Sequence, residues 1–237
     1  MRPRIIVTAS RGQNSAEYFA ALREAGADPV QIEPGDPVER ALDEAAGLLV
    51  TGGVDVDPAA YGAPASSQVT DVQAERDVLE LEALRSARGR GMPTLCICRG
   101  LQIANVTFGG TLITHIPAIL GDKSSIPHQP KGADGKTLRG LVDNHVVAIE
   151  PETLLADIVG TTTLVTGSRH HQAVLQATAD LRVVARTGDG IVEAMEARFA
   201  SPFWLAVQWH PESTVELDGG ASRAVFRRFA VAAGRRG

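Results

Sequence analysis

Short apolar runs alternate with amphipathic stretches through the first half of the chain, and this alternation constrains the fold more than any other feature. The apolar runs have the length of buried strands, and the stretches between them have helical spacing. The expected strands are 4–8, 30–33, 47–51 and 93–97, and the expected helices are 14–25, 38–46, 74–87 and 101–106. This alternation predicts an α/β fold with a mostly parallel sheet and helices on both faces.

The second half of the chain is richer in strand patterns. The expected strands are 142–149, 162–166, 181–186, 191–198 and 203–209, and the expected helices are 152–159 and 221–233. Two stretches rich in Pro, Gly, Ser and Asp, 54–73 and 117–140, are expected to be long surface loops. Because the chain has no internal repeat and no low-complexity linker, we predict a single domain over 1–237.

The clearest helical pattern covers residues 74–87. Its apolar residues at helical spacing are expected to face the core: Val78, Leu81 and Leu84. Glu80 is expected to point elsewhere. Arg76 and Asp77, at the start of this helix, are interpreted as a structural ion pair.

Charge and hydropathy exclude several classes of partner. The formal net charge is −5, with basic residues scattered among acidic ones, so no basic face is available for a nucleic acid backbone. No apolar run approaches the roughly 20 residues of a membrane span. The apolar stretch near the N-terminus, residues 5–7, is too short for a signal-peptide core, which favours a cytoplasmic location.

Cys96 and Cys98 are the only cysteines, and they are too close along one predicted strand to form a disulfide comfortably. We therefore expect free thiols. Cys98 stands where the strand 93–97 turns into the next helix, a nucleophile elbow whose backbone N–H groups favour a thiolate and can hold an oxyanion. Gly100 relieves crowding at such a turn, whereas Cys96 occupies a position where a glycine is usual.

A second motif, Gln-Trp-His-Pro-Glu, covers residues 208–212. An apolar strand delivers His210 at its end, and Pro211 holds the backbone of His210 extended. Glu212 is close enough to accept a hydrogen bond from the imidazole, which would fix its tautomer and stabilise the imidazolium. The motif is typical of a histidine that serves as a catalytic acid and base.

Together, CRGLQ at 98–102, TGG at 51–53 and QWHPE at 208–212 resemble the class I glutamine amidotransferase superfamily. Its members carry a Cys-His-Glu triad on an open, flavodoxin-like α/β sheet. Four further segments are similar to the stand-alone γ-glutamyl hydrolase branch, which is peptidase C26-like and includes γ-glutamyl-γ-aminobutyrate hydrolase. These segments are TGGVDVDPAAYG at 51–62, ERD at 75–77, ICRGLQIANVTFGGTL at 97–112 and SRHHQAV at 168–174.

The resemblance implies a cysteine hydrolase that cleaves the γ-glutamyl amide bond of a γ-glutamyl-amine or γ-glutamyl peptide through a thioester and needs no cofactor. Cys98 would be the nucleophile, His210 the acid and base, and Glu212 the carboxylate that orients His210. The backbone N–H groups of Gly53 and Arg99 would form the oxyanion hole.

The resemblance also implies binding residues for the glutamyl group: Gln102, His170 and Gln172. His171 is an alternative to His170 for this contact. Two positions depart from the pattern, because the family often has Asn in place of Gly167 and Asp in place of His115. No metal is expected, since neither His115 nor His128 has a Cys or carboxylate at metal-ligand spacing.

Two other functions remain open on the sequence alone. The chain could be a glutaminase subunit that supplies ammonia to a separate synthase, although CRG at 98–100 differs from the Gly-Leu or Gly-His that usually follows the nucleophile there. It could also be a non-catalytic binding protein on the same fold. The sequence determines neither the leaving amine nor the oligomeric state, and a homo-oligomer is one of the open alternatives.

Overall fold

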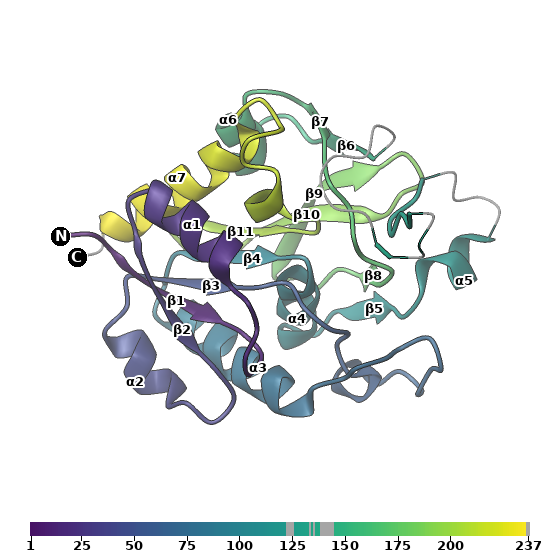
Figure 1. The fold of residues 1–237 in the computed structure, drawn as a ribbon, viewed down its shortest axis with the longest axis horizontal. Coiled ribbons are helices and arrows are strands. Elements are labelled where there is room, and N and C mark those ends of the chain that lie inside the picture. The colour runs from purple at the N-terminus through teal and green to yellow at the C-terminus, as the bar shows by residue number, and fades with distance from the viewer. Residues whose placement is uncertain (122–125, 133, 135, 138–144, 236–237) are drawn as a thin grey trace.

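The computed structural model describes all residues except 122–125, 133, 135, 138–144 and 236–237. These described residues form a central sheet of nine strands (Figure 1). One half of the sheet is parallel, in the order β2 (Asp28–Ile32), β1 (Arg4–Thr8), β3 (Gly47–Val50), β4 (Thr94–Ile97) and β11 (Trp204–Val207). The other half is antiparallel and continues with β10 (Val192–Ala197), β9 (Leu181–Thr187), β6 (Val146–Ile149) and β7 (Thr163–Val165).

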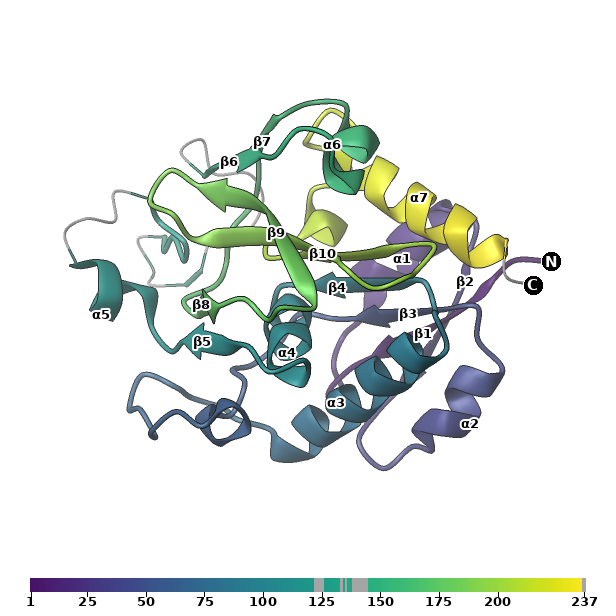
Figure 2. The same cartoon turned by 180° about the vertical axis from the view of Figure 1, so that it is seen from behind.

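Helices cover both faces of the sheet, which confirms the predicted fold class. One face packs against α1 (Ala16–Glu24), α6 (Leu154–Val159) and α7 (Ala221–Gly234). The other face packs against α2 (Val38–Asp43), α3 (Ala74–Gly89) and α4 (Arg99–Thr107). The two groups of helices lie on opposite sides of the strands in Figure 1, and Figure 2 shows the same arrangement from behind.

The central strands are apolar without interruption because each of their faces meets a layer of helices. In β4, Leu95 and Ile97 belong to the core on the α7 side, whereas Cys96 belongs to the core on the α3 side. The same alternation in β11 sends Val207 to the α7 side and Ala206 to the α3 side. Both strands are therefore anchored on two sides, and their carboxyl ends are held at fixed positions.

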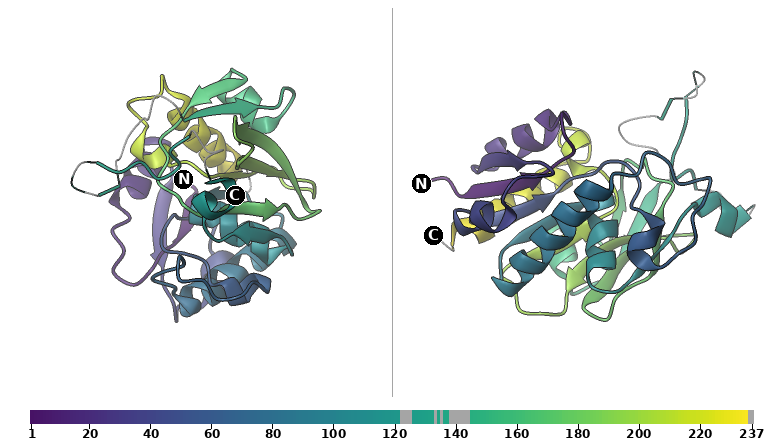
Figure 3. Two further views of the ribbon diagram at one scale, coloured as in Figure 1. Left: turned by 90° about the vertical axis from the view of Figure 1, so that its right-hand side faces the viewer. Right: turned by 90° about the horizontal axis from the view of Figure 1, so that it is seen from below.

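Smaller elements escaped the sequence analysis. β5 (Thr111–Ile113) and β8 (Ala173–Gln176) form a two-stranded antiparallel sheet beside α4 (Figure 2). α5 (Ile116–Leu120) follows β5 and lies at the far right of the right-hand view in Figure 3. A short 3-10 turn, Pro58–Tyr61, lies within the first predicted loop. The beginning of the predicted strand 142–149 lies outside the described residues, which resume at His145. No helix in the described part of the chain is long and apolar enough to cross a membrane.

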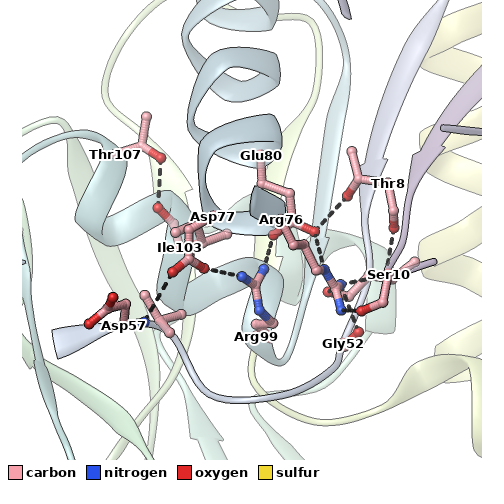
Figure 4. Close-up of polar contacts among 12 residues, drawn as sticks. Thr8, Ser10, Gly52, Asp57, Arg76, Asp77, Glu80, Arg99, Ile103 and Thr107 are labelled. Atoms are coloured by element: carbon pink, nitrogen blue, oxygen red, sulfur yellow. Dashed lines mark hydrogen bonds and ion pairs between the residues drawn. The ribbon is translucent and has the colours of Figure 1, made fainter. Parts of the chain in front are cut away.

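The predicted core face of α3 is confirmed for Leu84, which is buried, and for Leu81, which packs against the core, but it is wrong for Val78 and Glu80. Val78 is 63% exposed, whereas Glu80 and Arg76 are fully buried. The expected ion pair between Arg76 and Asp77 does not form; Arg76 pairs instead with Glu80 at 2.8 Å. Arg99 of α4 forms ion pairs with both Asp77 and Glu80 (Figure 4). The inference from hydrophobic periodicity assumed that charged side chains face solvent. In this protein four charged side chains lie in the core because they pair with one another.

Candidate active site

Cys98 occupies a sharp turn between β4 and α4. Its backbone has φ 55° and ψ −106°, a conformation that costs a residue with a β-carbon about 1–3 kcal/mol. The tightness of the turn also explains Gly100, because a β-carbon there would lie 2.3 Å from the Val50 carbonyl oxygen. The thiol of Cys98 is thus lifted out of the strand at the start of a helix. Cys96 stays inside the sheet, where burial raises the pKa of its thiol.

His210 lies at the same sheet edge because β11 runs parallel to β4, with Val207 paired to Ile97. Its Nδ1 lies 2.6 Å from Glu212 Oε1, and its side chain also forms a hydrogen bond with Cys98. A carboxylate can only accept a hydrogen bond, so Nδ1 of His210 carries a proton. Nε2 is then the ring nitrogen that is available to Cys98. A β-carbon on Gly52 would lie 2.8 Å from His210 Cε1, so the glycine pair after β3 leaves room for the imidazole.

Charges around His210 favour its protonated form. Burial alone would lower its pKa, but the negative charges of Glu212 and Cys98 raise the pKa to about 9. Burial would likewise raise the pKa of Glu212, yet His210 and Arg169 lower it. Arg169 Nη2 donates to Glu212 Oε1 at 3.1 Å. The arrangement therefore favours an imidazolium at His210, next to Cys98 and supported by a buried carboxylate.

Three residues that the sequence analysis did not single out also contact this group. Gln208 Nε2 donates to Cys98 Sγ at 3.5 Å, and the Tyr18 hydroxyl accepts a hydrogen bond from the Gly52 N–H at 3.0 Å. The third is Arg169, beside Glu212. Gln208 and Arg169 stand inside the motifs QWHPE and SRHHQAV, so their positions carried a signal, whereas nothing in the sequence around Tyr18 indicated a role.

The two residues predicted to form the oxyanion hole flank Cys98. Gly53 follows β3 and lines, together with Cys98, a cavity of about 190 Å³. Arg99 is the first residue of α4, and its side chain is turned into the ion pairs with α3, so the predicted contribution is that of its backbone N–H. A β-carbon on Gly53 would lie 2.1 Å from Arg76 Nη1. The oxyanion role of both N–H groups stays a prediction.

Predicted glutamyl-binding residues line the same cavity as Cys98: Gln102, His170 and Gln172. Gln102 Nε2 donates to the Gln172 carbonyl and to Gln208 Oε1, at 3.1 and 3.2 Å. Gln172 Oε1 accepts from the Val56 N–H at 3.3 Å, while Gln172 Nε2 has no hydrogen-bond partner among the described residues. A buried donor of this kind beside a thiol suits an anionic or carbonyl group of a ligand.

His170 and His171 also line this cavity, and they differ in burial and in their partners. His170 is 4% exposed, and its Nδ1 lies 2.9 Å from the Gln172 carbonyl oxygen. His171 is less buried, with Nε2 2.9 Å from Asp55 Oδ1 and Nδ1 3.1 Å from His115 Nδ1. Direct contact of either histidine with a substrate stays a prediction.

A family model over most of the chain and relatives at 30% identity or more place this chain, with its elbow cysteine, in the class I glutamine amidotransferase-like superfamily. Within that superfamily the chain belongs to the peptidase C26 family, whose sequence profile matches residues 5–212. It is a glutamine amidotransferase-like hydrolase of that family.

Relatives agree with this placement, and a solved structure agrees with the fold. Rv2859c of Mycobacterium tuberculosis, provisionally named a glutamine amidotransferase, is 38% identical over 209 residues, which are 86% of this chain and 64% of that protein. The γ-glutamyl-γ-aminobutyrate hydrolase PuuD of Escherichia coli K12 is 30% identical over 91% of this chain and 84% of its own length. The glutaminase domain of a Trypanosoma brucei CTPS with bound acivicin superposes with a TM-score of 0.65 at 18% identity, over 99% of this chain and 95% of that one.

Proposed function

We propose that the chain hydrolyses the γ-glutamyl amide bond of a γ-glutamyl-amine or γ-glutamyl peptide to glutamate and a free amine. The observation that carries the proposal is the cavity lined by both Cys98 and Gln172, whose amide Nε2 has no hydrogen-bond partner among the described residues. A zwitterionic glutamyl head needs paired polar contacts once it loses water, and Gln102 and Gln172 offer them beside the nucleophile. The name of the E. coli relative, a γ-glutamyl-γ-aminobutyrate hydrolase, supports the same substrate class.

In the first half of the reaction, the Cys98 thiolate attacks the γ-carbonyl carbon and a carbon–sulfur bond forms. The N–H groups of Gly53 and Arg99 hold the oxyanion. The carbon–nitrogen bond then breaks as the His210 imidazolium gives its proton to the leaving amine, which produces a γ-glutamyl thioester and neutral His210.

In the second half, neutral His210 takes a proton from water as the water oxygen attacks the thioester carbonyl. The carbon–sulfur bond breaks, the new γ-carboxylic acid gives the second water proton to solvent, and glutamate leaves with a free γ-carboxylate. The Cys98 thiolate and the His210 imidazolium are regenerated together. Glu212 stabilises the charged imidazole throughout this cycle because its Oε1 lies 2.6 Å from Nδ1.

Substrate preference tests the proposal. We expect γ-glutamyl amides of several amines to be cleaved and the matching α-glutamyl and β-aspartyl amides to be poor substrates. The reason is that Gln102 and Gln172, in the wall of the cavity, are proposed to recognise the glutamyl side of the substrate. Gln172→Ala should lower kcat/KM by roughly 10- to 100-fold for all leaving amines alike. Steady-state assays of a panel of γ-glutamyl amides measure both effects. Gln176→Ala, four residues along the same segment and exposed, is the matched control.

Three results would contradict this assignment. Equal cleavage of α- and γ-linked amides, or an effect of Gln172→Ala on certain amines only, would show that Gln102 and Gln172 do not recognise the glutamyl group. Hydrolysis of free glutamine that appears only after a synthase partner is added would identify a glutaminase subunit instead. Lack of turnover, together with lack of Cys98 alkylation by a γ-glutamyl electrophile, would identify a binding protein.

The raised pKa of His210 predicts a basic limb in the pH profile. Above about pH 9 the imidazolium loses the proton that the leaving amine requires, so kcat/KM should fall through that pH. The same charge stabilises the folded state below the unfolded pKa of about 6.5, and this contribution should disappear as pH rises through about 9. In Glu212→Gln the limb should move to lower pH, because the carboxylate charge that raises the pKa is gone. A limb at the same pH in both proteins would assign it to another group.

A further inference from the structure

Four buried side chains converge behind the wall of the active-site cavity, and the catalytic mechanism uses none of them directly: His128, His145, His170 and Glu193. One nitrogen or oxygen from each lies within 4.8 Å of the corresponding atoms of the other three. Their exposed fractions are between 0% and 4%. We call this group the His3Glu cluster.

The His3Glu cluster is assembled from separate segments. Glu193 lies on β10, His145 immediately precedes β6, and His170 stands two residues before Gln172. No metal was expected at His128 because the sequence places no cysteine or carboxylate at metal-ligand spacing from it. The premise of that expectation does not hold in space, because folding places the Asp189 and Glu193 carboxylates beside the His128 ring.

Partners outside the cluster fix the protonation of two of the rings. His128 Nε2 lies 3.0 Å from Asp189 Oδ2, and His170 Nδ1 lies 2.9 Å from the Gln172 carbonyl oxygen. Both partners can only accept, so these two nitrogens carry protons. In the neutral rings the opposite nitrogens, His128 Nδ1 and His170 Nε2, then present lone pairs to the centre. Metal-binding histidines are oriented in this way by carboxylates and backbone carbonyls.

A carboxylate oxygen lies where these lone pairs meet. Glu193 Oε1 is 3.3 Å from His170 Nε2, 3.3 Å from His145 Nε2 and 3.8 Å from His128 Nδ1. None of these four atoms has a hydrogen-bond partner among the described residues. Glu193 Oε1 and the lone-pair nitrogens of neutral His128 and His170 can only accept, so they repel one another unless a cation lies between them, and leaving them unsatisfied is costly.

We propose that the His3Glu cluster binds one divalent transition metal ion of the Zn²⁺ type, through His128 Nδ1, His145 Nε2, His170 Nε2 and the Glu193 carboxylate. Imidazole with a single carboxylate suits Zn²⁺ better than Mg²⁺ or Ca²⁺, which prefer oxygen ligands. A regular tetrahedron with bonds of about 2.05 Å places ligand atoms roughly 3.3 Å apart. The contacts of Glu193 Oε1 with His145 and His170 match that spacing.

The proposed site is structural because four protein ligands complete a tetrahedron and leave no position open for water or substrate. It would tie the loop that carries His128 and the segment before β6 to β10. His170 links it to the substrate wall, since the Gln172 carbonyl accepts from both His170 and Gln102. The metal would thus set the position of Gln172 without taking part in the reaction.

Metal content of the full chain, purified without a histidine tag, tests the inference. We expect about one zinc per chain by plasma mass spectrometry after exhaustive dialysis. X-ray absorption at the zinc edge should show nitrogen and oxygen neighbours at about 2.0–2.1 Å and no sulfur. Returning Zn²⁺ to chelator-treated protein, at a free concentration about 100 times Kd, should raise the Tm by roughly 5–10 °C.

Matched variants identify the ligands. His145→Ala should lose the zinc, whereas His115→Ala removes an imidazole outside the His3Glu cluster and should keep it. Cys98→Ala should also keep it, which separates this site from the proposed hydrolase chemistry. If His145→Ala does not fold, Co²⁺ added to metal-free wild-type protein should still give the intense visible absorption of a tetrahedral site. Wild-type protein with less than about a tenth of an equivalent of metal, and no Tm response to Zn²⁺ or Co²⁺, would show a proton-bridged cluster and overturn the proposal.

Discussion

Cys98→Ala is expected to lower kcat for γ-glutamyl amide hydrolysis by roughly 10⁴- to 10⁶-fold while leaving the fold intact. Without the thiol no thioester can form, and what remains is the activity that oxyanion stabilisation and binding can supply to water alone. The side chain is small and lies beside a cavity, so its loss creates little new empty volume. Steady-state kinetics and circular dichroism of the purified variant measure the two parts of this prediction.

Cys96→Ala is the matched control, because it removes an equal thiol two residues away. We expect it to keep most of its activity. Iodoacetamide should modify Cys98 much faster than Cys96, since only Cys98 has the helix start and His210 to stabilise a thiolate, while burial raises the pKa of Cys96. Equal reactivity of the two thiols, or full activity in Cys98→Ala, would refute the nucleophile assignment.

The second large effect concerns the buried ion-pair network of Figure 4. Glu80 pairs with both Arg76 and Arg99, and all three side chains are at most 1% exposed. Glu80→Ala would leave two guanidinium groups short of a counter-charge inside the protein. We expect a loss of about 3–5 kcal/mol in the free energy of unfolding, measured by urea titration.

An exposed ion pair provides the control for this experiment. Glu44 pairs with Arg4 at 2.6 Å, but both side chains are about half exposed to solvent. Glu44→Ala should therefore cost at most about 1 kcal/mol. Losses of similar size in the two variants would show that the network contributes no more than a surface pair.

The Glu80 network also explains why its loss should reach the active site. Arg76 donates to the Gly52 and Thr51 carbonyls, and Arg99 directly follows Cys98. These contacts hold the loop after β3 against the elbow. Glu80→Ala that still folds at low temperature should accordingly show reduced kcat as well as reduced stability.

Sequence reasoning predicted the parallel half of the sheet and the elbow, because buried parallel strands leave apolar runs such as residues 47–50 and 94–97 that are hard to mistake. It also placed His210 and Glu212 together, since they are two residues apart and Pro211 restricts the backbone between them. Local patterns of this kind survive in the sequence because the physical cause is itself local.

Contacts between distant residues left no comparable pattern. The buried face of α3 depends on Arg99, which is 19 residues beyond Glu80, and the meeting of His145 with Glu193 depends on how β6 and β10 are arranged in the sheet. The strands β5 and β8 are three and four residues long, too short for a periodicity to be recognised. Such features are set by tertiary packing, which a single sequence does not display.

The position of β11 has a consequence for how the protein is made. It is the last strand in the chain, yet it lies between β4 and β10 in the middle of the sheet, and it brings Gln208 to Cys98 across 110 residues. Chains emerge from the ribosome at about 5–20 residues per second, so Cys98 is synthesised several seconds before His210. A nascent chain cannot close its sheet until this strand inserts. The proposed nucleophile therefore lacks its proposed base until His210 is synthesised, and we expect the growing chain to be inactive until then.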